Sequence, residues 1–313
     1  MSTRRQFIGQ VIGQSSAVLA GSALLNTSWI SLAAAASEGQ MLKRTIPSSG
    51  ETVPAIGMGT SGSFEITIGS PEYTALKEVL KRFFDGGATL IDTAPTYSNA
   101  EDVLGPLLAE AKLRPKAFIA TKLSGVVGRD QGLAQFQKTL KSLRTDKVEL
   151  LQVHNLGDWK TQMALARELK QQGKVKYTGI THYVDSAHEQ LADVVQETKP
   201  DFMQINYSVT NRGAEQRLFP MAKELGIAVL VNRNFNDGKL FNQVKGKELP
   251  GWAKEVGVTS WAQMFLKFCL SHEAVTAVIP ATGKPERQSD NLKAGFGPLL
   301  SAAQKKEIIQ LVS

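Results

Sequence analysis

Eight short apolar runs, spaced from about residue 41 to the end of the chain, constrain the fold more than any other feature of the sequence. Each run is rich in Val, Ile, Leu and Ala, as expected for a strand covered on both faces, and amphipathic stretches separate the runs. This alternation is typical of strand–helix units that build a parallel sheet. The expected strands are 55–58, 89–92, 117–121, 148–153, 177–180, 202–205, 228–231 and 276–279.

The number of units favours a closed (β/α)₈ TIM barrel, an α/β fold that needs about 250 residues. The alternative is a doubly wound open sheet, but no G-x-G-x-x-G follows the first strand, and GMGT at 57–60 keeps only two glycines. Residues 42–54, with a turn at Ser49-Gly50, predict an N-terminal β-hairpin at the bottom of the barrel. No linker divides residues 37–313, so we expect one domain there. Helices are expected at 73–85, 100–111, 133–143, 162–172, 186–197 and 214–225.

Four polar residues stand at or just beyond the ends of three successive expected strands. Asp92 ends the strand at 89–92 and Tyr97 follows it, Lys122 follows the next strand, and His154 follows the strand at 148–153. Because the carboxyl ends of parallel barrel strands meet at one rim, we expect these four side chains to lie close together.

A tyrosine beside a lysine is suited to donating a proton. The phenol has an ordinary pKa of about 10, and a neighbouring ammonium favours the ionised form and lowers that pKa. We expect Lys122 to supply this charge and Asp92 to hold Lys122 in place. His154 is expected to bind a substrate oxygen or to relay a proton. Taken singly, each residue also has an ordinary structural explanation, such as a turn cap, a packed ring or a surface charge.

The first 36 residues form a separate segment. STRRQFI at 2–8, a moderately apolar stretch and four alanines at 33–36 resemble a twin-arginine signal peptide cleaved after Ala36. Polar residues interrupt the apolar stretch, so it lacks the roughly 18 to 20 continuous apolar residues of a stable membrane span. We therefore expect the twin-arginine export machinery as a partner and a periplasmic location. An ordinary N-terminal extension is the alternative.

Charge, histidine and cysteine content argue against other kinds of site. The net charge is +7, but the basic residues are scattered among acids without a basic block, so no nucleic acid partner is expected. The histidines His154, His182, His188 and His272 show no H-x-H or H-E-x-x-H spacing, and no metal is expected. The single Cys269 excludes a thiolate-rich site and is expected to be a packed core thiol.

Six segments together carry a resemblance to a known family. They are GMGT at 57–60, IDTAPTY at 91–97, TK at 121–122, QVH at 152–154, QINY at 204–207, and the run from IP at 279–280 to DN at 290–291. In this order and spacing, residues 37–313 resemble an aldo-keto reductase along nearly their whole length. The resemblance implies a TIM barrel, NAD(P)H bound without a Rossmann module, and reduction of an aldehyde or ketone to an alcohol.

The resemblance also implies roles for individual residues. Tyr97 is the general acid and Lys122 lowers its pKa, while Asp92 pairs with Lys122 and His154 orients the carbonyl group or joins a proton relay. Lys284 and Arg287 are placed to meet a 2′-phosphate at a helix N-terminus, so NADP is favoured over NAD. The alternative is a cationic helix start that faces only water. The implied cofactor contacts are Gly59, Thr60, Asp92, Thr181, His182, Gln204, Asn232, Arg233, Thr282, Lys284, Arg287, Asp290 and Asn291.

Two positions depart from the family pattern. Thr181-His182 replaces the Ser-Asn that many members carry after Gly179-Ile180. Asn232 stands where an aromatic ring commonly stacks on the nicotinamide, so stacking has to come from Arg233 or Phe235, or be weaker.

Export and a nicotinamide cofactor fit together poorly, because free NADPH is a cytoplasmic metabolite. A reductase that works outside the cytoplasm needs a second redox partner to recharge its bound nucleotide. Two functions therefore stay open. One is NADP-dependent reduction of a small-molecule carbonyl substrate, in the periplasm or before export. The other is a nucleotide-bound sensor or interaction module that keeps the barrel with little turnover.

Overall fold

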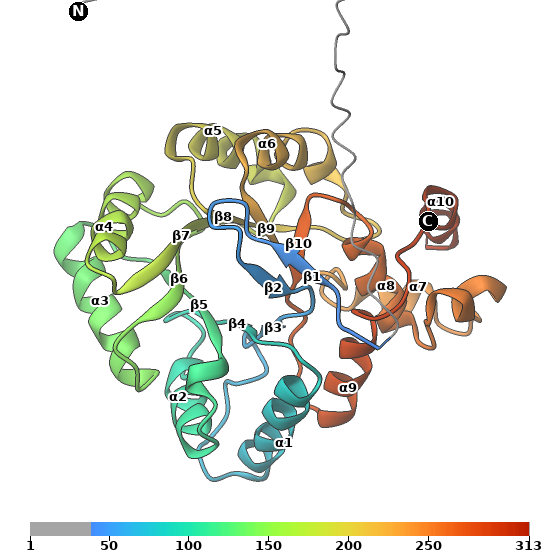
Figure 1. Cartoon of the computed structure of the whole chain (residues 1–313), viewed down its shortest axis with the longest axis horizontal. Coiled ribbons are helices and arrows are strands. Elements are labelled where there is room, and N and C mark those ends of the chain that lie inside the picture. Colours follow the sequence, from blue (N-terminus) through green and yellow to red (C-terminus); the bar gives the residue numbers. More distant parts are fainter. Residues whose placement is uncertain (1–38, 313) are drawn as a thin grey trace, which may run out of the picture. The chain divides into compact units, whose positions relative to one another are not determined.

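The computed structural model describes residues 39–312, so the expected signal peptide at 1–36 lies outside the described residues. Eight parallel strands follow one another around a nearly closed barrel, with helices on its outside (Figure 1). Strands pair in chain order, and bridges from Ile56 to Val278 and from Gly59 to Ala281 join the last strand to the first. The strands are β3 (Met58–Gly59), β4 (Leu90–Asp92), β5 (Phe118–Leu123), β6 (Val148–His154), β7 (Val175–Thr181), β8 (Phe202–Asn206), β9 (Ala228–Asn232) and β10 (Val275–Val278).

All eight expected strands are present, which confirms the barrel and excludes the doubly wound sheet. The first strand is shorter than expected, because only Met58–Gly59 pairs with β4 while Ile56 bridges to β10. This segment is packed closely between β4 and β10. A Cβ at Gly57 would lie 2.9 Å from a side-chain carbon of Leu90 and 3.0 Å from the Leu90 carbonyl oxygen, so a larger residue would force these neighbours to shift.

The helices begin and end at residues with suitable local chemistry. Ser70 caps α1 by accepting a hydrogen bond from the Tyr73 amide, and a left-handed Gly226 ends α6. No helix within residues 39–312 is long and apolar enough to cross a membrane. The α-helices are α1 (Pro71–Asp85), α2 (Ala100–Glu110), α3 (Arg129–Ser142), α4 (Trp159–Gln171), α5 (His188–Thr198), α6 (Leu218–Leu225), α7 (Lys239–Gln243), α8 (Trp261–Leu270), α9 (Pro285–Lys293) and α10 (Ala302–Leu311). Short 3₁₀ helices are η1 (Arg114–Lys116), η2 (Asp185–Ala187), η3 (Gly213–Glu215) and η4 (Gly251–Val256).

Apolar side chains form two layers because each strand alternates its faces. Leu90 belongs to the inner cluster, which fills the barrel, while the next residue, Ile91, belongs to the larger cluster between the strands and the helices. Cys269 lies in this outer cluster, where burial raises the pKa of its thiol to about 12, and the expectation of a packed core thiol is confirmed. With both faces of the strands covered, the near-continuous apolar runs of the sequence are explained.

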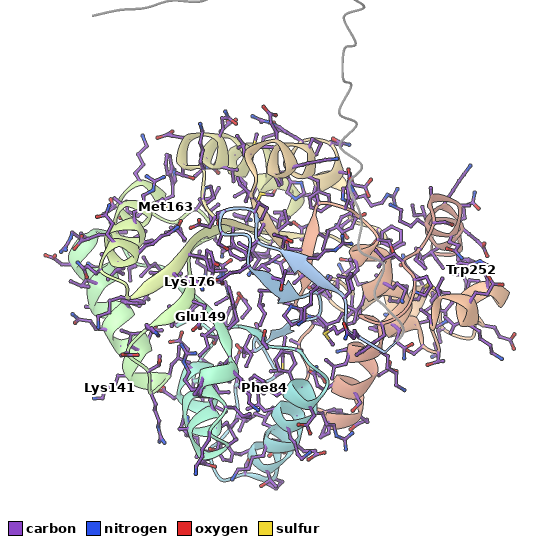
Figure 2. The ribbon with its side chains drawn as sticks, viewed as in Figure 1. Phe84, Lys141, Glu149, Met163, Lys176 and Trp252 are labelled. Atoms are coloured by element: carbon purple, nitrogen blue, oxygen red, sulfur yellow. The ribbon has the colours of Figure 1, made fainter. Side chains whose placement is uncertain are left out.

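The expected hairpin covers one end of the barrel. Its strands, β1 (Lys43–Thr45) and β2 (Thr52–Pro54), pair antiparallel and lie across the ring of barrel strands in Figure 1. Ile46 and Val53 join the inner cluster. Lys176, near the start of β7 and labelled in Figure 2, lies 2.5 Å from the carboxylate of Glu51 in the hairpin. The hairpin therefore closes the amino ends of the strands and leaves the carboxyl ends open.

Candidate active site

The carboxyl ends of the barrel strands surround a cavity of about 540 Å³. This is the end at which barrel enzymes place their active sites. The residues that line it are Gly59, Thr60, Ser61, Asp92, Tyr97, His154, Asn155, Thr181, Tyr183, Gln204, Asn232, Arg233, Asn234, Phe235, Asp237, Gly238, Ile279, Pro280 and Ala281.

The stagger of the strands brings the expected catalytic residues to one level. Asp92 on β4 lies opposite Ala120 on β5, and Lys122 is two residues farther along that strand. Lys122 in turn lies opposite Gln152 on β6, and His154 is again two residues farther. Because side chains alternate with a period of two, each such step keeps the side chain on the inner face of the barrel.

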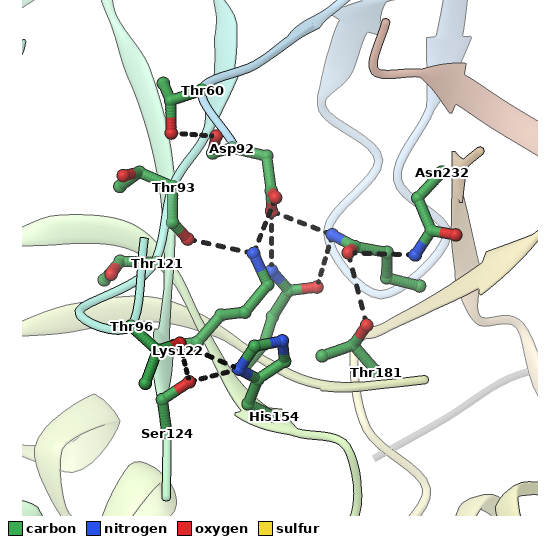
Figure 3. Close-up of polar contacts among 12 residues, drawn as sticks. Thr60, Asp92, Thr93, Thr96, Thr121, Lys122, Ser124, His154, Thr181 and Asn232 are labelled. Atoms are coloured by element: carbon green, nitrogen blue, oxygen red, sulfur yellow. Dashed lines mark hydrogen bonds and ion pairs between the residues drawn. The ribbon is translucent and has the colours of Figure 1, made fainter. Parts of the chain in front are cut away.

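Lys122 and Asp92 form a buried ion pair, and Asp92 is one of the residues that line the cavity (Figure 3). The Lys122 Nζ lies 2.6 Å from the Asp92 Oδ1 and also donates to the Thr93 carbonyl at 2.9 Å. The two side chains are 0% and 4% exposed. Burial by itself lowers the pKa of Lys122, but the negative charge of Asp92 and the phenol of Tyr97 more than offset it, so the pKa is raised and the amine stays charged.

The second carboxylate oxygen of Asp92 is held by two glutamine side chains. Gln152 donates to Oδ2 at 3.0 Å and Gln204 donates to it at 2.8 Å. The carbonyl oxygen of Gln204 accepts hydrogen bonds from Thr181 at 3.2 Å and from Asn232 at 3.3 Å (Figure 3). Gln204, an expected cofactor contact, therefore lines the cavity with both ends of its carboxamide already bonded to the protein.

Tyr97 lies in the loop between β4 and α2, where its amide donates to the Ala94 carbonyl at 3.0 Å. The Lys122 Nζ lies 4.8 Å from the centroid of the phenol ring, and the His154 ring meets it edge-on at 6.0 Å. Burial raises the pKa of Tyr97, while Lys122 acts to lower it. The net shift is upward. The expected lowering of the Tyr97 pKa is therefore wrong, because burial outweighs the effect of a lysine whose charge is already paired with Asp92.

His154 is a neutral imidazole at the cavity wall. Burial, followed by the charge of Lys122 and then by His182, lowers its pKa to about 3. The His154 Nδ1 contacts the Ser124 hydroxyl and lies 3.5 Å from the Thr96 hydroxyl, which donates to Ser124 at 3.1 Å (Figure 3). The ring can therefore give or accept a hydrogen bond without carrying a charge.

Asn232, the position at which the sequence lacks an expected aromatic ring, presents its amide to the cavity. Its Nδ2 donates to the His182 carbonyl at 3.1 Å and to Gln204. Its Oδ1 is buried and has no hydrogen-bond partner among residues 39–312. The site thus keeps one unpaired polar acceptor in a residue that lines the cavity.

Three planar groups stack at the same wall. Tyr183 lies nearly parallel to His182, with ring centroids 5.5 Å apart, and the guanidinium of Arg233 lies 4.5 Å from the Tyr183 centroid. Arg233 also pairs with Asp237 at 3.2 Å, and Phe235 packs against Phe241 at 5.1 Å. Both groups expected to stack on a nicotinamide therefore already have ring partners inside the protein.

The expected phosphate-binding residues lie outside the cavity lining, at the start of α9. Lys284 is the residue before the helix and Pro285 begins it, as expected. Lys284 and Arg287 are exposed, and neither forms an ion pair with another residue in the described range. The helix start therefore offers unpaired cations next to backbone amides, an arrangement that suits an anion.

The other residues of this segment that were expected to contact the cofactor form hydrogen bonds within the protein or are buried. Asp290 accepts hydrogen bonds from Ser260 and Gln263, each at 2.6 Å, which tie α9 to α8. The Thr282 hydroxyl accepts from the Lys284 amide at 3.2 Å, and Asn291 is buried.

Sequence reasoning missed several residues of the site. Gln152, Ser124 and Thr96 are absent from the expected site residues, although Gln152 contacts Asp92 and the other two contact His154. A usable signal existed for two of them. Ser124 is two residues beyond Lys122 and Gln152 is two residues before His154, so strand alternation places each pair on one face.

Comparison with known proteins shows which proteins this chain is similar to. The model of the aldo/keto reductase family matches residues 55–312. The L-glyceraldehyde 3-phosphate reductase of Escherichia coli O157:H7 is 26% identical over 328 residues, which cover 88% of this chain and 93% of that protein. Two Saccharomyces cerevisiae proteins described as aryl-alcohol dehydrogenases are 31% identical over 180 residues, 49% of this chain. The chain spans about half the length of these two relatives, 47% and 54%.

Solved structures show the same fold. An aldo-keto reductase from Klebsiella pneumoniae, determined in complex with NADPH, superposes with a TM-score of 0.72 at 23% identity, covering 87% of this chain and 95% of that one. An aldo-keto reductase from Bacillus halodurans in its holo form gives a TM-score of 0.69 at 21% identity, covering 87% and 96%.

Proposed function

The chain belongs to the aldo/keto reductase family, and we propose that this oxidoreductase reduces an aldehyde or ketone to an alcohol, with NADPH as the hydride donor and Tyr97 as the general acid. One observation carries the proposal. Tyr97 and His154 line the cavity, and the Lys122 ammonium, paired with Asp92, lies 4.8 Å from the centroid of the Tyr97 ring.

Carbonyl reduction needs a hydride at the carbon and a proton at the oxygen. When bound, a reduced nicotinamide supplies the hydride. Burial raises the pKa of Tyr97, so its phenol holds a proton at neutral pH. Negative charge grows on the substrate oxygen and then on the phenol oxygen as this proton moves. The nearby ammonium of Lys122 stabilises that charge mainly in the transition state, which is the condition for faster turnover.

The other two residues have supporting roles. Asp92 keeps the ammonium of Lys122 in place, and its remaining oxygen is satisfied by Gln152 and Gln204. His154 is uncharged because its pKa is lowered to about 3, so it contributes a hydrogen bond to the carbonyl oxygen instead of a full proton.

The described residues fit a nicotinamide nucleotide in two places. The buried Asn232 Oδ1 is free to accept a hydrogen bond, because both hydrogen bonds that the Asn232 side chain forms within residues 39–312 use Nδ2. It therefore suits the amino group of a carboxamide. The exposed Lys284 and Arg287 at the start of α9 suit a phosphate. These two cations support a preference for NADPH over NADH, and the Klebsiella pneumoniae relative was determined with NADPH.

A direct assay tests the function. Residues 37–313 would be mixed with NADPH or NADH and a panel of carbonyl compounds, and loss of the nicotinamide absorbance would be followed. The panel takes its members from the relatives, and includes a triose phosphate, methylglyoxal and an aromatic aldehyde. We expect turnover of at least one compound, faster with NADPH. Absence of turnover with tightly bound NADPH would refute catalysis.

We extend the proposal to location, on the basis of the sequence of residues 1–36, which lie outside the described range. The twin-arginine motif supports export to the periplasm through the twin-arginine machinery, followed by recharging through a second redox partner. Replacing Arg4 and Arg5 by lysine should retain the full-length protein in the cytoplasm. Cell fractionation measures this, and unchanged periplasmic yield would contradict export.

A nucleotide-bound sensor is the second candidate function. It is favoured by the amide at Asn232 and by the side chains of Gln204 and Arg233, which already have partners within the protein. Protein purified with bound nucleotide distinguishes the two candidates. Bleaching of its absorbance by carbonyl compounds supports the reductase, and a signal that persists across the panel supports the sensor.

A further inference from the structure

We propose that Ser124, assisted by Thr96, fixes the proton of the His154 ring on Nε2, the nitrogen that meets the substrate oxygen. This inference rests on the proposed carbonyl reduction. Ser124 is a positioning residue here, because it acts on the substrate only through His154.

The contacts define a short chain of hydroxyl groups that ends on the imidazole (Figure 3). The Thr96 hydroxyl donates to the Ser124 Oγ at 3.1 Å, and the Ser124 Oγ contacts the Nδ1 of His154. The other ring nitrogen, Nε2, has no hydrogen bond to any residue in the range 39–312. His154 lines the cavity, so this second nitrogen is the one left for a ligand.

Counting protons decides the direction of the chain. Each hydroxyl has one proton to donate, and Thr96 uses its own on Ser124. If Ser124 donates to Nδ1, every proton of the chain has an acceptor. If Nδ1 carried the proton instead, the Ser124 oxygen would receive two donors and its own proton would have no acceptor among residues 39–312. Ser124 is only 2% exposed, so water does not readily serve as that acceptor.

The doubly protonated ring is disfavoured by its surroundings. Burial and the ammonium of Lys122 hold the pKa of His154 at about 3. Two neutral forms remain, and the hydroxyl chain selects the one protonated at Nε2. An Nε2–H group can donate to a carbonyl oxygen, whereas a bare Nε2 would repel that oxygen through its lone pair.

Ser124 is itself held in place by the neighbouring helix. The side chain of Gln135 in α3 accepts from the Ser124 amide at 2.8 Å and donates to the Ser124 carbonyl at 2.8 Å. These two bonds fix the backbone of residue 124 just beyond the end of β5. The hydroxyl is therefore presented to His154 by a rigid support, as a pre-set site requires.

In this proposal, two groups donate hydrogen bonds to the substrate oxygen, and they have different roles. Tyr97 gives up its proton, and the Nε2–H of His154 donates a hydrogen bond without transferring its proton. The division requires the correct tautomer before the substrate arrives. Loss of the Ser124 hydroxyl should therefore weaken turnover more than nucleotide binding.

The test reads the tautomer directly by NMR on protein labelled with ¹⁵N-histidine, alongside kinetics. The chain has four histidines, so the His154→Gln variant identifies the His154 signals. In the wild-type protein we expect Nε2 to carry the proton. In Ser124→Ala we expect a mixture of tautomers and a kcat about tenfold lower, equivalent to about 1.4 kcal/mol, with the Kd for NADPH unchanged.

Two further variants separate this role from a general loss of structure. Ser124→Thr keeps the hydroxyl and should restore both the tautomer and kcat. Ser49→Ala removes a hydroxyl that bonds to Tyr177 at the opposite end of the barrel, and should leave both unchanged. If Ser124→Ala does not fold, the wild-type spectrum and Ser124→Thr still decide the question.

Three outcomes overturn the proposal: a proton on Nδ1 in the wild-type protein, an unchanged tautomer in Ser124→Ala, or an altered tautomer with full kcat. The spectrum is recorded without substrate. Failure of every carbonyl compound to react would therefore refute the reductase and leave the tautomer result standing on its own.

Discussion

The ammonium of Lys122 lies over the phenol ring of Tyr97, 4.8 Å from its centroid, while pairing with Asp92 at 2.6 Å. The Lys122 ammonium can therefore pair with the Asp92 carboxylate before the proposed reaction and with a Tyr97 phenolate during it. In the resting site the carboxylate holds the charge, and the phenol stays protonated because burial raises its pKa. In the proposed reaction, the same charge then becomes available to the phenolate that proton transfer would leave on Tyr97.

The first prediction concerns the proton donor. Tyr97→Phe removes the hydroxyl and should lower kcat by about 100- to 1,000-fold, the usual loss for one donor to a developing oxyanion. Nucleotide affinity should stay the same, because the ring remains. Steady-state kinetics and a fluorescence titration measure the two quantities. Tyr73→Phe, which removes a hydroxyl bonded to Glu110 on the helix layer, is the control. Near-normal turnover in Tyr97→Phe would exclude the assigned role.

The second prediction concerns the ion pair. Lys122→Met leaves the buried carboxylate of Asp92 without its cation, and should destabilise the fold by about 3 to 5 kcal/mol. Adding Asp92→Asn should recover part of this loss, because the uncompensated charge is removed. Urea unfolding of the single and double variants measures the difference. Equal stability of Lys122→Met and the wild type would show that the pair is not tightly buried.

The third prediction concerns pH. The pKa of His154 is about 3 in the folded protein and about 6.5 in an unfolded chain, so the unfolded state binds a proton first as the pH falls. Keeping His154 neutral therefore costs no stability above pH 6.5. Below that pH the free energy of unfolding falls progressively down to about pH 3, by up to about 1.4 kcal/mol per pH unit.

Urea unfolding between pH 4.5 and pH 7 checks this dependence. His154→Gln should lose less stability than the wild type over that range, because residue 154 can no longer bind a proton on unfolding. The other three histidines are unchanged in this variant. Turnover of the wild type should show no ionisation of His154 between pH 5 and pH 7. Parallel stability curves for the two proteins would contradict the lowered pKa.

The fourth prediction concerns nucleotide choice. Arg287→Ala should weaken NADPH binding about tenfold or more, the value of one hydrogen bond to a charged group, and leave NADH binding nearly unchanged. Lys284→Ala should act in the same direction. Lys293→Ala, at the other end of α9, is the matched control for loss of one positive charge. Isothermal titration with both nucleotides decides, and equal losses for both would place the 2′-phosphate elsewhere.

The sequence predicts the barrel and the pairing of Asp92 with Lys122 well, because both follow from local rules. Apolar runs of strand length, glycines at turns and a polar residue at the end of each strand are visible without any knowledge of distant contacts. The convergence at one rim then follows from parallel strands in a closed barrel.

Other properties of the site depend on contacts far apart in the chain. Gln204 turns toward Asp92, 112 residues away, and no local pattern predicts that direction. Burial of Tyr97, which sets the direction of its pKa shift, depends on packing by several loops. The Ser124 hydroxyl is intermediate, because strand alternation from Lys122 predicts its face but not its contact with His154.

The hairpin that closes the amino ends of the strands has a kinetic consequence. In the proposed reaction, we expect substrate, nucleotide and product to pass through the opening at the carboxyl ends, where the described cavity lies. A nucleotide and a substrate that enter through one opening obstruct each other unless the ligand that binds deeper enters first and leaves last. For the proposed reaction we therefore expect a compulsory order of binding, set by the hairpin that covers the other end of the barrel.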